Sequence, residues 1–241
     1  MVFGNLFIRP LKGEYGSLCY REHQVRCGSQ LLLIARGNGM LQTIHFQKLS
    51  KAINCGNFYE LPTLQTSIIK PEISIRRATS GDAELIADLS RSTFLETFAS
   101  QNTKENMDKF MNEQFTREKL MKEVGVQQNI FLIAEIDDEA VGYARMREVP
   151  NPAGLDSLPA IELARIYSVQ SRIGKGIGSA LMKKCIEVAQ QEKKQVLWLG
   201  VWEKNQHAIS FYERWGFEKF SEHEFVLGDD VQTDWLMKKA L

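Results

Sequence analysis

The residues best suited to chemistry form a glycine-rich loop over residues 173–178 (IGKGIG), between a predicted strand and a predicted helix. The first N–H groups of a helix have no partner within it and carry partial positive charge, so they can bind a phosphate that comes close. Gly174, Gly176 and Gly178 have no side chain to block that approach. The pattern predicts a phosphate-binding loop. The alternative is a glycine-rich turn that only admits the helix close to the sheet.

Two other phosphate-binding loops do not match this segment. A Walker A loop needs Ser or Thr after its GK, but Lys175 is followed by Gly176. A Rossmann fingerprint needs a third glycine three residues after the second, where Ser179 stands instead. The loop alone therefore leaves its ligand open.

A second motif lies downstream, over residues 202–217, and reads WEKNQHAISFYERWGF. With the glycine loop before it, this run resembles the motifs of the GCN5-related N-acetyltransferase (GNAT) superfamily. The resemblance covers residues 72–241. More narrowly, GVWEKN, AISFYERWGF and the ending LGDDVQTDWLMKKAL are similar to bacterial PaiA-type spermidine/spermine N-acetyltransferases.

The resemblance implies acetyl-CoA as the cosubstrate, with its pyrophosphate on the glycine loop and its pantetheine arm near Asn205. The coenzyme-binding residues that it implies are Ile166, Tyr167, Ser168, Arg172, Ile173, Gly174, Lys175, Gly176, Ile177, Gly178, Ser179, Asn205 and Tyr212. The family usually has Gln or Arg where this chain has Ile173. We therefore expect backbone N–H groups of residues 174–179 to hold the pyrophosphate, with Arg172 as a side chain that can reach it.

Acetyl transfer to an amine needs a base and an acid. An alkylamine has a pKa near ~10 and must lose a proton before it can attack. The resemblance places the base on the strand before the loop, where Glu162 is the candidate, acting through water; a solvated carboxylate is the alternative. The resemblance also implies that backbone N–H groups near residues 166–168 stabilise the oxyanion. Tyr212 stands where the family has the tyrosine that protonates the leaving thiolate.

Tyr212 and Asn205 also have purely structural interpretations. An aromatic residue on a helix with Ile209 and Phe211 is often a packing residue. An asparagine before a helix is often an N-cap. For Asn205 the two roles are compatible.

The elements that must position these residues follow from the hydrophobic periodicity. We predict strands over residues 73–78, 130–136, 140–148, 161–169, 195–201, 217–227 and 231–240, and helices over 80–99, 103–124, 176–192 and from 205 to a stop at Gly216. Ser80 is the predicted cap of the first helix, and residues 137–139 the turn of a hairpin. This order predicts a mixed α/β sheet between helices, a three-layer α/β/α arrangement. The resemblance identifies it as the GNAT acyl-CoA N-acyltransferase fold.

The composition changes near Pro71, which divides the chain into an N-terminal extension, residues 1–71, and the acetyltransferase domain, residues 72–241. No aspartate precedes Asp82, and three of the four cysteines precede residue 56. Apolar residues in the extension follow neither the helix nor the strand period. We expect a flexible leader, or a segment upstream of the native start, in preference to a small domain.

The composition limits the partners and the cellular compartment that we expect for the protein. The formal net charge is zero, which gives no general attraction to nucleic acid. Four cysteines without a CxxC pair favour a reducing cytoplasm, and no apolar stretch approaches the ~20 residues that span a bilayer. His207 and His223 lack metal-ligand spacing, so we expect no metal. The expected partners are a small amine, such as a polyamine, and a second copy of the chain in a homodimer.

The amine itself stays open at this point. Alternatives are another acceptor, such as a protein N-terminus or an aminoglycoside, and a module that binds acyl-CoA without catalysis. The acidic group Glu203, Asp229, Asp230 and Asp234 could attract a polycation, but a solvated loop explains most such clusters. Trp198, Trp202 and Trp235 are expected in the core.

Overall fold

The computed structural model of the 241-residue chain describes residues 23–27, 30–37, 40–45, 72–155 and 158–241. The chain divides into two compact units, Met1–Pro71 and Glu72–Leu241. The first contains an antiparallel sheet of β1 (His23–Cys27), β2 (Gln30–Gly37) and β3 (Met40–His45). The periodicity did not predict these strands. The other expectations for residues 1–71 fall outside the described residues.

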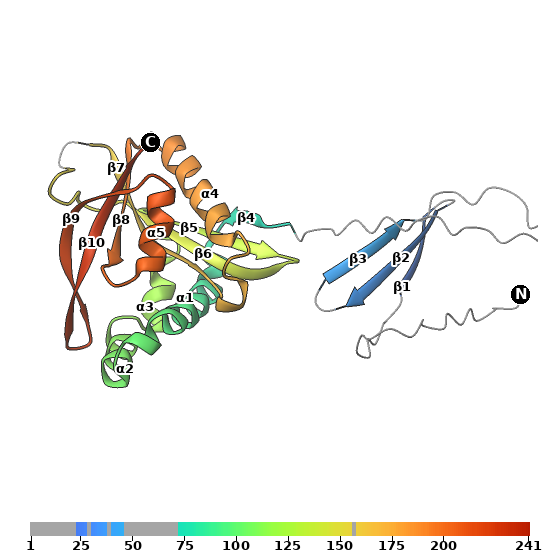
Figure 1. Cartoon of the computed structure of the whole chain (residues 1–241), viewed down its shortest axis with the longest axis horizontal. Helices are drawn as coiled ribbons and strands as arrows, with labels where there is room; N and C mark the ends of the chain where they lie inside the picture. The colour runs from blue at the N-terminus through green and yellow to red at the C-terminus, as the bar shows by residue number, and fades with distance from the viewer. Residues whose placement is uncertain (1–22, 28–29, 38–39, 46–71, 156–157) are drawn as a thin grey trace, which may run out of the picture. The chain divides into compact units, whose positions relative to one another are not determined.

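The second unit is built on a seven-stranded sheet, in the order β4-β5-β6-β7-β8-β10-β9 (Figure 1). Its strands are β4 (Ser74–Arg77), β5 (Asn129–Ile136), β6 (Glu139–Arg147), β7 (Ala160–Ser168), β8 (Val196–Trp202), β9 (Glu218–Leu227) and β10 (Asp230–Ala240). Neighbouring strands are antiparallel except β7 and β8, which are parallel.

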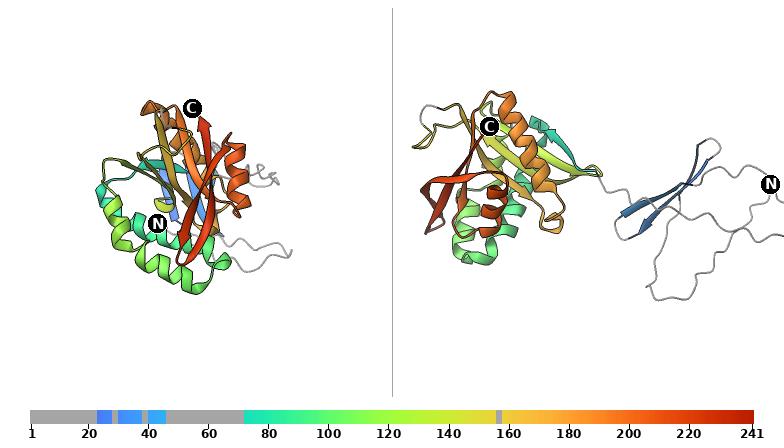
Figure 2. Two further views of the ribbon diagram at one scale, coloured as in Figure 1. Left: turned by 90° about the vertical axis from the view of Figure 1, so that its left-hand side faces the viewer. Right: turned by 45° about the horizontal axis from the view of Figure 1, so that its top comes forward.

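Helices cover both faces of this sheet (Figures 1 and 2). On one face lie α1 (Ala83–Phe98), α2 (Lys104–Glu113) and α3 (Arg117–Glu123), and on the other α4 (Ile177–Gln191) and α5 (Gln206–Arg214). The predicted three-layer mixed α/β fold is thus confirmed. Within the described residues no helix is long and apolar enough to cross a bilayer.

The core under α4 follows the predicted amphipathic face. The apolar residues at helical spacing on α4 are all buried against the sheet: Ile177, Leu181, Cys185, Val188 and Ala189. A fully buried Leu or Ile side chain contributes roughly 1.5–3 kcal/mol. In β8 every residue is buried except Gly200, as expected of a central strand covered on both faces.

The turn and cap residues predicted from the sequence were partly correct. Asp137 and Asp138 have φ of 51° and 63° and make the predicted hairpin turn, and Gly216 ends α5 at φ 80°. The predicted cap Ser80 is wrong: it lies inside a short 3-10 helix, η1 (Ser80–Asp82), whose N-cap is Thr79, and the N-cap of α1 is Asp82. The Thr79 N–H donates to the Asp82 carboxylate at 2.8 Å, which fixes this start.

The predicted helix over residues 103–124 is also wrong, since it is two helices. Thr103 accepts a hydrogen bond from Asn106 N–H at the start of α2, and Thr116 accepts one from Lys119 N–H at the start of α3. A second N-cap threonine breaks the helix because its side chain satisfies the N–H groups of a new first turn. Phe115, in the connection, is buried.

Gly142 on β6 sets how closely the end of β7 and the start of α4 approach the sheet. A Cβ atom added there would lie 2.7 Å from the Tyr167 carbonyl oxygen and 3.0 Å from Ile177 Cγ2. Real side chains do not tolerate such contacts, so a larger residue would push both segments outward. The glycine loop lies between these two segments.

Gly142→Ala is therefore expected to destabilise the domain by about 1–3 kcal/mol, because the tight contact is with backbone as well as side chain. Denaturant unfolding of the two proteins measures the difference. Gly81→Ala is the matched control, since its Cβ would lie 3.5 Å from its nearest neighbour. Equal midpoints for Gly142→Ala and the parent protein would contradict this packing argument.

Candidate functional site

An opening between β7 and β8 is the central feature of the site. Their parallel pairing ends at Glu162 and Trp198. Beyond that point β7 runs on to Ser168 beside β6, and β8 to Trp202 beside β10. In residues 72–155 and 158–241, the facing edges of these two segments have no strand partner. A cavity of about 740 Å³ occupies the opening.

The glycine loop forms one wall of this cavity. Gly174 and Gly176 have φ of 78° and 90°, a conformation that glycine adopts without strain. The Ala180 N–H bonds to the Gly176 carbonyl at 2.9 Å and is the first N–H satisfied within α4. The N–H groups before it, in residues 177–179, have no intrahelical acceptor. The Lys175 N–H, which belongs to the predicted set 174–179, instead donates to the Arg172 carbonyl at 3.2 Å. The N–H groups of residues 177–179 are available to an anion in the cavity.

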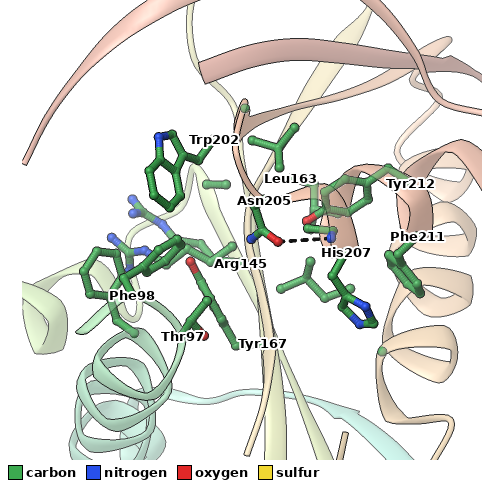
Figure 3. Close-up of a pocket in the computed structure, with 18 of the residues that line it drawn as sticks. Thr97, Phe98, Arg145, Leu163, Tyr167, Trp202, Asn205, His207, Phe211 and Tyr212 are labelled. Atoms are coloured by element: carbon green, nitrogen blue, oxygen red, sulfur yellow. Dashed lines mark hydrogen bonds between the residues drawn. The ribbon is translucent and has the colours of Figure 1, made fainter. Parts of the chain in front are cut away.

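Tyr212 on α5 faces the same cavity. Its ring packs between those of Phe211 and Phe217, with centroids 5.5 and 5.8 Å away, and the residue is 9% exposed. Its hydroxyl points into the cavity (Figure 3). Burial raises the pKa of this phenol well above its ordinary value, with a smaller contribution from Cys185. Tyr212 is thus a packing residue whose phenol stays neutral at physiological pH.

Asn205 combines a structural bond with a free group. Its Oδ1 accepts the Ala208 N–H at 3.1 Å and caps α5, as Figure 3 shows. Its amide nitrogen has no hydrogen-bond partner in the described part of the chain. The N-cap interpretation is correct, and the remaining donor can bind a ligand in the cavity.

All but one of the sequence-predicted site residues line this cavity. The exception is Lys175, which lies in the loop but not in the lining. Ile173 is 55% exposed, so its side chain contributes little packing. Arg172 lies in the short helix η3 (Gln170–Arg172), with its guanidinium 3.7 Å from Glu139.

The opposite half of the cavity, toward α1 and α2, is aromatic and charged (Figure 3). Its aromatic lining residues are Phe94, Phe98, Phe110, Phe115, Tyr167, Trp198, Trp202 and Phe225. Trp198 and Trp202 are buried, as expected, yet they also face this space.

The charged residues in the half of the cavity toward α1 and α2 form two groups of ion pairs. Glu162, 7% exposed, accepts from Arg147 Nε at 2.5 Å and Nη2 at 3.0 Å. Arg145 and Arg165 share one carboxylate, Glu123, at 2.7 and 2.6 Å. Burial, followed by repulsion from Arg165, lowers the pKa of Arg145 to about 10. The expected base is thus present, with both carboxylate oxygens in an ion pair.

Comparison with known proteins identifies the fold. The profile of the "Acetyltransferase (GNAT) family" matches residues 89–217. An uncharacterized N-acetyltransferase of Lactobacillus delbrueckii subsp. lactis is 38% identical over 175 residues, 70% of this chain and 98% of that protein. This chain belongs to the GNAT family of acetyltransferases. It is an N-acetyltransferase with acetyl-CoA as its cosubstrate.

Two further comparisons connect this GNAT chain with PaiA-type enzymes. Spermidine N(1)-acetyltransferase of Thermoplasma acidophilum is 24% identical over 171 residues, 69% of this chain and 96% of that protein. The crystal structure of PaiA N-acetyltransferase from the same organism, in complex with coenzyme A, has a TM-score of 0.58 at 22% identity. The structural alignment covers 70% of this chain and 99% of the crystallised chain. At this identity, the structural comparison supports the fold alone.

For Asp234 the sequence left two alternatives, attraction of a polycation and a solvated loop. Asp234 lies within β10, in the predicted strand over residues 231–240, its side chain is 17% exposed, and it lines the cavity of this GNAT site. The solvated-loop alternative is therefore wrong for this residue. In the described residues no group of three His, Cys, Asp or Glu side chains is arranged to hold a metal.

Gly176→Val is expected to weaken coenzyme A binding by at least about tenfold, or ~1.4 kcal/mol. Valine is strained at φ 90°, so the loop would have to change the conformation that presents the first N–H groups of α4. Ile173→Ala, the matched change in the same loop, should alter the Kd by less than about twofold, since that side chain is exposed. Calorimetric titration measures both. Similar losses from the two changes would contradict a pyrophosphate site made of backbone N–H groups.

Proposed function

We propose that this GNAT enzyme acetylates a primary amine of the polyamine class, such as spermidine or spermine. The observation that carries the proposal is the β7–β8 opening, which has the glycine loop on one side and the aromatic, charged half of the cavity on the other. The polyamine class is supported by similarity to a relative named spermidine N(1)-acetyltransferase. In the aromatic half of the cavity, Arg147 is paired with Glu162, and Glu123 offsets one of the two charges of Arg145 and Arg165, which limits their repulsion of a cationic substrate.

The coenzyme half fits acetyl-CoA by its donors. The free N–H groups at the start of α4 would hold the pyrophosphate, and the Asn205 amide would contact the pantetheine arm. Bound there, acetyl-CoA supplies an activated acetyl group in the opening. The unpaired edge of β7 near Ile166 would present backbone N–H to the carbonyl oxygen as negative charge develops on it.

Two side chains move the protons of the reaction. Glu162, through a water molecule, takes a proton from the amine, which then attacks the acetyl carbonyl carbon. As the carbon–sulfur bond breaks, Tyr212 donates its proton to the sulfur, and the nitrogen of the new amide loses its second proton, which returns Tyr212 to its neutral form. The raised pKa of Tyr212 keeps that proton in place until the thiolate forms. The buried Glu162–Arg147 pair has little net charge, so it does not hold the amine in its protonated form.

A second candidate acceptor is an amine that also carries a carboxylate. Arg145 and Arg165 share one glutamate, which leaves one positive charge of the pair unmatched. A buried unmatched charge favours an anionic ligand group.

A thiol-release assay with acetyl-CoA separates these functions. The panel contains spermidine, spermine, an amino acid, an amino-terminal peptide and an aminoglycoside. Fastest release with the polyamines supports the proposal. Turnover confined to the amino acid or the peptide would show that those amines, and not polyamines, are the acceptors. Coenzyme binding without thiol release on any amine would indicate a non-catalytic module.

Tyr212→Phe is expected to lower kcat by about a hundredfold or more, because only the acidic hydroxyl is lost. The Kd for coenzyme A should stay within about threefold, since the ring and its packing remain. Stopped-flow turnover and calorimetry give the two numbers. An unchanged kcat would remove Tyr212 from the acid role.

The Glu162→Gln variant tests whether Glu162 acts as the base or only forms a structural ion pair with Arg147. It should lower kcat/KM at neutral pH by about tenfold or more, and the loss should shrink as rising pH deprotonates the amine. Arg147→Gln breaks the same ion pair but keeps the carboxylate, so a base role predicts a smaller loss. Equal, pH-independent losses in the two variants would show that the pair is only structural.

A further inference from the structure

A notch opens in the wall of the cavity at Gly200. The other residues of β8 are buried, but Gly200 is exposed to the cavity. A Cβ atom at this position would lie 3.5 Å from His223 Nε2 and 3.6 Å from Asp234 Oδ2. The missing side chain therefore leaves space directly in front of an imidazole and a carboxylate.

Cross-strand pairing brings these groups together. Asp234 on β10 lies opposite Trp202 on β8 and opposite His223 on β9. Leu236, two residues on, lies opposite Gly200. Because alternate residues of a strand share a face, Gly200, Trp202, Asp234 and His223 all belong to the face that contributes to the cavity.

Asp234 differs from the other carboxylates of this region in its partners. Glu162 is paired with Arg147, and Glu123 with two arginines. For Asp234 the ion-pair partner within residues 72–155 and 158–241 is His223, whose Nε2 is 3.8 Å away. Burial raises the pKa of Asp234, and the nearby His223 offsets only part of this effect. The Asp234 carboxylate is therefore available to bind a cationic group of a ligand.

The position of Asp234 suits a cation that remains charged. A carboxylate in contact with an ammonium group stabilises the protonated form, whereas the attacking amine must be neutral. Asp234 also lies on β10, one strand beyond the β7–β8 opening, and neighbouring strands are ~4.8 Å apart. An acceptor with its reacting amine in the opening reaches Asp234 through a short methylene chain.

We infer that the notch formed by Gly200, His223 and Asp234 binds a second ammonium group of the acceptor, one that is not acetylated. The inference rests on the proposed function, since it presumes an amine acceptor, and it names the feature that selects diamines over monoamines. The aromatic side chains of Trp198 and Trp202 border the notch, and a weakly hydrated site of this kind strengthens the attraction of opposite charges.

The test compares butane-1,4-diamine with butylamine, which has the same chain and one amine. For the parent enzyme we expect a higher kcat/KM with the diamine. Asp234→Asn should lower that value about tenfold or more, mainly through KM, because a charge-assisted contact is lost. With butylamine the change should be less than about twofold.

Two further variants guard against a general effect on folding. Asp230→Asn alters an exposed carboxylate of the same strand and should leave both substrates unaffected. Gly200→Ala fills the notch while keeping Asp234, and should also lower diamine selectivity. Equal losses for both substrates in Asp234→Asn, or no diamine preference in the parent enzyme, would overturn the notch while leaving acetyl transfer intact.

Calorimetric titration of butane-1,4-diamine into the coenzyme A complex gives a readout that does not need turnover. Binding by the parent protein that Asp234→Asn weakens about tenfold supports the notch, even if no amine is acetylated. Undiminished binding by Asp234→Asn would overturn it. Failure of the proposed function appears separately, as absence of thiol release with every amine.

Discussion

Three parallel residue pairs join β7 to β8, and the site depends on where that pairing stops. Had it continued to the ends of both strands, backbone hydrogen bonds would have closed the sheet and left no cavity. Instead β6 holds the far part of β7, and β10 holds the far part of β8. The sheet stays continuous at its base while two strand edges remain open. The opening therefore exposes unpaired backbone groups, and ligands can reach it from both faces of the sheet.

The helices on the two faces give the opening two different halves. On one side, the start of α4 supplies free N–H groups and α5 supplies Asn205 and Tyr212. On the other side, α1 and α2 contribute aromatic residues above the charged strands. Charge is distributed unequally in that second half, since Glu162 and Glu123 are paired with arginines, whereas the ion-pair partner of Asp234 among the described residues is an imidazole. A carboxylate without a strong cationic partner suits cation binding.

Much of this was predictable from the sequence because the signals are local. The glycine loop, the amphipathic face of α4, the Asn205 cap and the stop at Gly216 each depend on neighbours within a few residues. Two contacts that the sequence did not predict depend on distant pairing, whereas the wrong cap at Ser80 and the missed break before α3 are local errors. The Glu162–Arg147 ion pair requires the β6–β7 register, and the contact of Asp234 with His223 requires the β9–β10 register. The break before α3 was missed because Thr116 fits both a helix interior and a cap.

The central claim is that the β7–β8 opening binds acetyl-CoA, with its diphosphate on the start of α4 and its sulfur beside Tyr212. A crystal structure of the protein with coenzyme A tests it most directly. We predict pyrophosphate oxygens within ~3.2 Å of backbone nitrogens in residues 174–179, and the thiol sulfur within hydrogen-bond reach of the Tyr212 hydroxyl. A coenzyme that binds outside the opening, or one whose sulfur lies far from Tyr212, would contradict the account.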